Sequence, residues 1–242
     1  LFISCPIIRC ITRRCTGRQF RCAPLPPVSL VVSSLTNFNA GGRILKNILV
    51  KQAVAIPLGA MLVPILLAFF LPGYSSISQH ISEVALLDHP IALIQRAAAL
   101  ITGVSIALFG AWLFLAKGSK FTAVTAVVFG ASMISNGVFV MGSPLHGLYG
   151  LGFFMVLVPA FFATEVAPVG SPLRNFSMLV ALVIMLYLWL MLSGFDPHGL
   201  RGLTQRVATL IIFGWYAVAS YSLVRGINSS TTRPDKHAVA AG

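Results

Sequence analysis

The side chains best suited to chemistry lie in three connections between long apolar runs. Four of the five histidines and three of the five acidic residues of this 242-residue chain lie there. Imidazole, carboxylate, hydroxyl and guanidinium groups in one place can bind a metal ion, hold an anion or transfer a proton. The side chains concerned are His80, Ser82, Glu83, Asp88, His89, His146, Asp196, His198, Arg201, Gln205 and Arg206.

One interpretation of this pattern is a metal site formed by His80, His146 and His198. Imidazole is a preferred ligand of zinc, and an open coordination position would activate water. The function would then be that of a metal-dependent membrane lipid hydrolase. The pattern is weak, because no two histidines have the His-x-x-x-His spacing that places both on one helix face. The sequence has no Walker motif and no Gly-x-Ser-x-Gly, so it assigns no catalytic residue.

A second interpretation is a pocket for a small polar ligand or a lipid headgroup. An arginine can hold a phosphate or carboxylate through two parallel hydrogen bonds. A third interpretation needs no ligand, because polar residues also end membrane helices and meet water. The residues of the predicted pocket are Ser82, Glu83, His146, Arg201, Gln205 and Arg206.

The elements that must position these residues are six apolar runs. Hydrophobic residues make up 57% of the chain and charged residues 9%, with a mean hydropathy of +0.90. A soluble domain carries about 25% charged residues, and a helix needs about 20 apolar residues to cross a bilayer. The runs lack the alternation of barrel strands. We therefore predict an all-α polytopic bundle of about six transmembrane helices, near 53–71, 97–116, 121–141, 146–164, 176–193 and 206–224.

Lysine and arginine residues favour one side of this predicted bundle. Cytoplasmic loops of membrane proteins carry an excess of both, which predicts that both termini are cytoplasmic and that the histidine-bearing connections are not. The net charge of +12 forms no contiguous basic patch with aromatics, so the expected partner is the lipid bilayer and not nucleic acid. The predicted cytoplasmic side holds Arg43, Lys46, Lys51, Lys117, Lys120, Arg174, Arg225, Arg233 and Lys236, and the other side Arg96, Arg201 and Arg206.

Two features predict how the bundle is organised internally. Small residues such as Gly103, Gly130 and Gly137 permit close helix packing, and Asn136 should face a neighbouring helix and not lipid. The segment 77–87 could form a short helix capped by Ser75 or Ser76.

The chain divides into three parts by composition. Residues 1–42 are rich in arginine and contain no acidic residue, which predicts a disordered or spurious extension outside the fold. Residues 43–226 hold the predicted transmembrane domain. Residues 227–242 are predicted to be a disordered cytoplasmic tail.

The run from Tyr74 to Val84, Tyr-Ser-Ser-Ile-Ser-Gln-His-Ile-Ser-Glu-Val, resembles the first outer loop of the domain of unknown function 998 (DUF998) family. Two further segments are similar to that family. One is 142–147, where His146 is expected to begin the fourth helix, and the other is 202–206, at the expected start of the sixth. The resemblance covers roughly 53–226. It implies a prokaryotic membrane protein of about six helices, and it points to Ser82, Glu83, His146 and Arg206 as residues to test.

These observations favour a protein of the bacterial cytoplasmic (inner) membrane that binds a small polar or lipid-headgroup ligand at its non-cytoplasmic mouth. A metal-dependent lipid hydrolase is the enzymatic alternative. A transporter or accessory subunit is the third, and it would need a polar path through the membrane, for which Asn136 is the main candidate.

Overall fold

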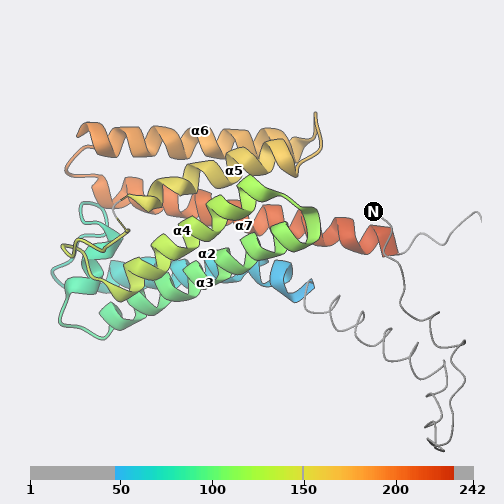
Figure 1. Ribbon diagram of the computed structural model, residues 1–242. Coiled ribbons are helices and arrows are strands. Elements are labelled where there is room, and N and C mark those ends of the chain that lie inside the picture. The colour runs from blue at the N-terminus through green and yellow to red at the C-terminus, as the bar shows by residue number, and fades with distance from the viewer. Residues whose placement is uncertain (1–46, 149, 232–242) are drawn as a thin grey trace, which may run out of the picture. The chain divides into compact units, whose positions relative to one another are not determined.

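The computed structural model describes residues 47–148 and 150–231, and the regular elements in this part of the chain are all helices (Figure 1). One apolar helical segment falls on each of the six predicted runs. The prediction of an all-α polytopic bundle is confirmed, and the chain is an integral membrane protein. Five segments are long and apolar enough to cross a membrane, Asn47–Phe70, Ile91–Lys117, Lys120–Val138, Pro172–Ser193 and Arg201–Ile227, and Leu151–Glu165 is apolar but shorter.

The first segment contains helix α2 (Ile56–Leu67) between two 3-10 turns, η2 (Gln52–Val54) and η3 (Ala68–Phe70). The short 3-10 helix η4 lies in the connection that follows. The remaining elements are η4 (Ile81–Leu86), α3 (Ile91–Lys117), α4 (Lys120–Val138), η5 (Leu151–Phe153), α5 (Phe154–Glu165), α6 (Pro172–Ser193) and α7 (Arg201–Thr231).

Several element boundaries differ from the prediction, and α3, for example, begins at Ile91 and not near residue 97. The fourth segment begins at Leu151 and not at His146, because Gly142, Gly147 and Gly150 all have positive φ angles that a helix does not accommodate. Helix α7 begins at Arg201 and continues to Thr231, so Arg206 lies one turn inside it. The predicted extension at 1–42 and residues 232–242 of the predicted tail lie outside the described residues.

The bundle is built mainly by pairing of sequence neighbours, and the first and last helices, α2 and α7, also contact each other. Helix α3 packs along α4, α5 packs against both α4 and α6, and α2 and α6 both contact α7. The α3–α4 pair is closest, as its glycines predicted: a Cβ on Gly103 would lie 2.5 Å from the Gly130 carbonyl oxygen, and one on Gly130 would lie 2.6 Å from that of Gly103. Backbones can approach this closely only where side chains are absent.

Helix α4 is held at both ends by a charged side chain. Glu165 accepts hydrogen bonds from the backbone N–H groups of Phe121 (3.2 Å) and Thr122 (2.8 Å) at its N-terminus. Arg96 donates to the carbonyl oxygens of Gly137 (3.0 Å) and Val138 (2.9 Å) at its C-terminus. Each charged group forms hydrogen bonds with backbone groups that have no partner within the helix, and each interacts favourably with the helix dipole.

Three connections gather at one end of the bundle, which we call the loop end (Figure 1). These are the connection from Leu71 to Pro90 that contains η4, the connection between α4 and η5, and the one between α6 and α7. The α3–α4 and α5–α6 turns lie at the opposite end (Figure 1). The predicted polar residues are therefore brought to the same end of the molecule.

Candidate functional site

The connection 71–90 is fastened to the first turns of α7 by a buried arginine. Arg206 is 3% exposed. It donates to the carbonyl oxygens of Gln79 (3.0 Å) and Gly202 (2.9 Å) and to the hydroxyl of Tyr74 (2.9 Å). The Tyr74 hydroxyl in turn donates to the carbonyl of His80 (2.8 Å). Burial raises the pKa of Tyr74 against the opposing effect of Arg206, so the phenol keeps the proton that it donates.

Two further contacts complete this attachment. The backbone N–H of Leu203 donates to the carbonyl of Ile77 (2.9 Å), and the backbone N–H of Ile81 donates to Oε1 of Gln205 (2.6 Å). Gly202 permits the approach, because a Cβ there would collide with the Gln79 carbonyl and lie 2.6 Å from that of Ser76. We refer to Tyr74, Gln79, Ile81, Gly202, Gln205 and Arg206 as the loop–α7 junction.

Glu83 braces the loop itself. Its carboxylate accepts from the backbone N–H of His80 (3.0 Å) and from Nε2 of Gln79 (3.3 Å). This is the N-terminal capping arrangement of η4, with Glu83 three residues after the cap. The predicted short helix therefore exists, but it begins at Ile81 and uses His80 and Glu83 at its start in place of Ser75 or Ser76.

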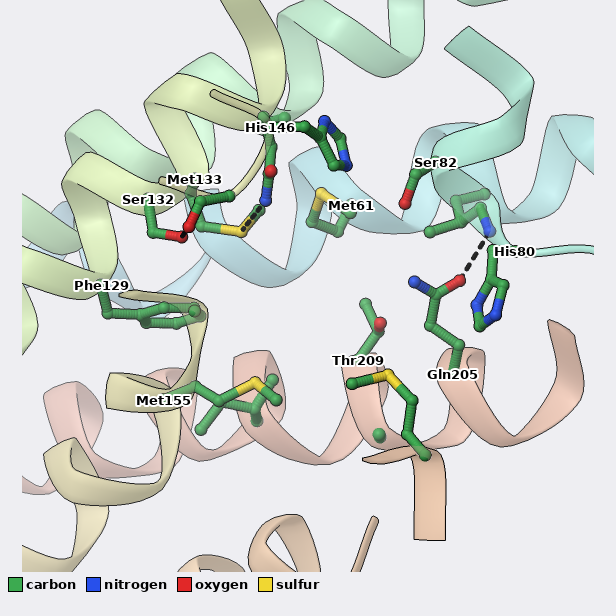
Figure 2. Close-up of a pocket in the computed structure, with 18 of the residues that line it drawn as sticks. Met61, His80, Ser82, Phe129, Ser132, Met133, His146, Met155, Gln205 and Thr209 are labelled. Carbon is green, nitrogen blue, oxygen red and sulfur yellow. Dashed lines mark hydrogen bonds between the residues drawn. The ribbon is translucent and has the colours of Figure 1, made fainter. Parts of the chain in front are cut away.

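A cavity of about 410 Å³ opens beside this junction, between η4, the α4–η5 connection and helices α2 to α7. This volume lies in the range of roughly 300–1,000 Å³ that is usual for small-molecule sites. Figure 2 shows Met61, Met133 and Met155 around the space, with Ser82 and Gln205 on its loop side. Five of the seven methionines of the chain line it: Met61, Met133, Met141, Met155 and Met191.

On α3, α4 and α7 the most polar lining residue lies nearest the loop end, whereas on α6 Tyr187 lies deeper than Met191. On α7 the lining runs from Gln205 through Thr209 to Phe213, and on α4 it runs from Asn136 to Phe129. At about 1.5 Å of rise per residue, these steps span roughly 12 Å and 10 Å. On α3 the same order holds, with Gln95 nearer the loop end than Ala99. The cavity thus has a polar mouth and an apolar floor.

Two side-chain oxygens at the mouth have no hydrogen-bond partner within the described structure. They are Oε1 of Gln95 and Oδ1 of Asn136, and both are buried. Gln95 is only 7% exposed. A buried acceptor without a partner costs about 1–3 kcal/mol, so such groups in a native protein call for an explanation.

The structure divides the predicted ligand-binding residues into two groups. Ser82, His146 and Gln205 line the cavity. Glu83 and Arg206 do not line it, because both are engaged in the internal bonds of the loop and the junction. Arg201 begins α7 and is also absent from the cavity wall.

The three histidines predicted to hold a metal are not brought together. His80 and His146 line the cavity, but His198 lies exposed in the α6–α7 connection. Nδ1 of His146 lies 2.8 Å from the carbonyl oxygen of Phe139. Among residues 47–148 and 150–231, no three His, Cys, Asp or Glu side chains are placed to hold a metal ion. The geometry therefore gives no support to the zinc hydrolase interpretation.

Sequence reasoning missed several residues of the cavity. Gln95 lies just before the predicted start of the second run, where a polar residue is most simply interpreted as the end of the membrane-spanning segment. Asn136 was expected to face a neighbouring helix, and it does lie on an inward face, where its Nδ2 contacts the Met133 sulfur at 3.9 Å. Asn136 was thus singled out, although not as part of a pocket, and the signal that could have found Gln95 is an amide side chain within a few residues of a helix end in an otherwise apolar run.

Comparison with known protein families gives a match that covers the cavity and the junction. The family model described as protein of unknown function (DUF998) matches residues 53–222. The chain belongs to the DUF998 family. The match spans the whole cavity wall, from Met61 to Phe213, and the complete loop–α7 junction. Curated proteins and solved structures give no significant match.

Proposed function

We propose that this DUF998 protein binds a small amphipathic ligand in the cavity at its loop end. The observation that carries the proposal is a cavity of about 410 Å³ with two buried, unpartnered amide oxygens at its polar mouth. A ligand whose polar part lies at the mouth and whose apolar part lies on the floor would satisfy both ends of the wall. Methionine side chains suit such a site, because they are flexible and polarisable and adapt to the shape of an apolar ligand.

The loop–α7 junction serves this function by fixing one side of the mouth. Ile81 and Gln205 belong to both the junction and the cavity wall. The bonds of Arg206 and Gln205 thus hold η4, with His80 and Ser82, over the mouth. A binding site built on fixed elements loses less free energy on binding than one that must first become ordered.

The proposed location is the bacterial cytoplasmic membrane, with the loop end on the non-cytoplasmic side. The lysines and arginines near the opposite end support this orientation. With Cys5, Cys10, Cys15 and Cys22 changed to Ser, cysteines at 118 and at 199 test it in intact cells. A membrane-impermeant maleimide should label Gly199→Cys and leave Gly118→Cys unlabelled until the cells are opened. The reverse labelling would refute the orientation.

Filling the cavity tests the binding function directly. Ala99 is buried and lines the cavity, whereas Ala97 is exposed on the same helix. Ala99→Phe should occupy part of the space, while Ala97→Phe makes the same chemical change outside it. Both proteins are purified from membranes in mild detergent, and the small molecules that each retains are measured by native mass spectrometry beside the unchanged protein.

We expect a retained small molecule in the unchanged protein and in Ala97→Phe, and its loss in Ala99→Phe. The melting temperature of Ala99→Phe should stay close to that of the unchanged protein, because the added ring enters free volume. Retention of the same molecule by a folded Ala99→Phe protein would contradict binding in this cavity.

A further inference from the structure

The chemical class of the ligand follows from which polar atoms the cavity leaves free. The cavity wall offers both hydrogen-bond acceptors and donors. Oε1 of Gln95 and Oδ1 of Asn136 accept and cannot donate. The hydroxyls of Ser82 and Thr209 and the amide nitrogen of Gln205 belong to lining residues and can donate. A ligand head that fits must therefore both donate and accept, as a hydroxyl group does.

The residues that line the cavity also indicate which charge the ligand can carry. No lysine, arginine, aspartate or glutamate belongs to the lining of the cavity in the described structure. The nearby charges are already used, since Arg206 is bonded to Gln79, Gly202 and Tyr74, and Glu83 is bonded within the loop. A cationic head placed there would lose its hydration and find no counter-charge, and an anionic head would find only the imidazoles of His80 and His146, so a charged head is unfavourable.

We infer that the ligand is an uncharged amphiphile whose head carries hydroxyl groups, such as a long-chain glycerol ether or a long-chain alcohol. Its hydroxyls donate to Gln95 and Asn136 at the mouth, and its hydrocarbon chain passes toward Phe129 and Phe213 on the floor. This inference rests on the proposed function, and it adds the head chemistry and the direction in which the ligand lies.

The test uses the full-length protein in lipid nanodiscs and a photoactivatable dodecylglycerol ether with a diazirine at the end of its chain. After irradiation, labelled peptides are identified by mass spectrometry. Labelling should fall on peptides that contain Phe129, Met155 or Phe213. Four unlabelled dodecyl compounds then compete: the glycerol ether, its dimethyl ether, dodecyl phosphate and dodecylamine.

The glycerol ether should compete at least tenfold better than the dimethyl ether, which has the same shape and no donor. Dodecyl phosphate and dodecylamine should compete less well still. Gln95→Leu and Asn136→Leu should each weaken binding about tenfold, as loss of one hydrogen bond in a buried site does. Tyr216→Phe is the matched control, because it removes a buried, unpartnered hydroxyl outside the cavity wall and should leave binding unchanged.

The failures of the two proposals are distinguishable. Labelling of the cavity floor with equal or better competition by the dimethyl ether, the phosphate or the amine would overturn the uncharged hydroxyl head and leave the binding function standing. Unchanged binding in both folded leucine variants would also overturn it. Labelling confined to lipid-facing peptides, uncompeted by any of the four compounds, would overturn the binding function and the inference with it.

Discussion

The loop–α7 junction and the cavity mouth lie side by side at the loop end, yet they treat polar groups in opposite ways. At the junction, Arg206 donates three hydrogen bonds and Gln205 accepts one from the loop. At the mouth, the amide oxygens of Gln95 and Asn136 are buried and bonded to nothing in the described structure. The junction uses most of its polar atoms to hold the fold, with Nε of Arg206 left unpartnered, whereas the mouth leaves both amide oxygens without a partner.

This difference assigns separate roles to polar residues that the sequence analysis placed in one predicted site. Charged residues gathered at a membrane-protein mouth invite a ligand-binding interpretation, but here the buried arginine is bonded internally, whereas the uncharged amides of the cavity wall keep unpartnered oxygens. Satisfied buried networks stabilise a fold, whereas unsatisfied buried groups weaken it unless a ligand or water completes them. The same substitution, polar to leucine, should therefore have opposite effects in the two regions.

The largest effect is expected at Arg206. Arg206→Leu removes three charge-assisted hydrogen bonds and leaves two carbonyls and a phenol without their donor. We expect a loss of about 3–5 kcal/mol in the free energy of unfolding, measured by thermal or denaturant unfolding in detergent. Arg201→Leu removes a similar charge five residues earlier, outside the junction, and should change stability by less than about 0.5 kcal/mol. Equal losses in the two variants would mean that net charge, and not the junction, controls stability.

Gly202→Ala should have the next largest effect. The added Cβ would collide with the Gln79 carbonyl and meet that of Ser76 at 2.6 Å, so the loop must move away from α7. Forced backbone shifts of this kind cost about 1–3 kcal/mol. Gly199→Ala is the matched control, since a Cβ there meets nothing within 4 Å. Faster proteolysis within 71–90 in Gly202→Ala alone would report the displaced loop, and equal cleavage of both variants would argue against the close contact.

The sequence predicted the helices and the end of the bundle at which polar residues meet, because both depend on long apolar runs and on the alternation of membrane crossings. It could not assign their roles. Whether Arg206 faces a ligand or a loop depends on where 71–90 packs against α7, and those segments are more than 100 residues apart in the chain. The methionines of the cavity come from α2, α4, α5, α6 and a connection, so no spacing in the sequence groups them.

Gln205 tests the boundary between the two regions, because it belongs to both. Gln205→Met keeps the length of the side chain but removes the acceptor for the Ile81 N–H. We expect a loss of about 1–2 kcal/mol in stability, the cost of one unpaired buried donor. Thr209→Val, one turn deeper on the same cavity face, should be close to neutral. If both variants were neutral, the Ile81 bond would not contribute to holding the loop.

The smallest effect, and the one of opposite sign, is expected at the mouth of the cavity. Gln95→Leu replaces an unpartnered buried acceptor by an apolar group of similar size. In ligand-free protein this should leave stability unchanged or raise it by up to about 1 kcal/mol, because a desolvated oxygen is removed. With ligand present, the stability of the unchanged protein should rise with the logarithm of ligand concentration, and that of Gln95→Leu should rise less. Melting curves of both proteins, with and without dodecylglycerol ether, measure the stability of the ligand-free protein and the stabilisation by ligand.

If Gln95→Leu instead lost more than about 1 kcal/mol of stability without ligand, the Gln95 amide would contribute to the fold as Arg206 does, and the division between the two regions would fail. A gain in stability joined to a loss of ligand response would identify Gln95 as a residue kept for binding at some cost to the fold.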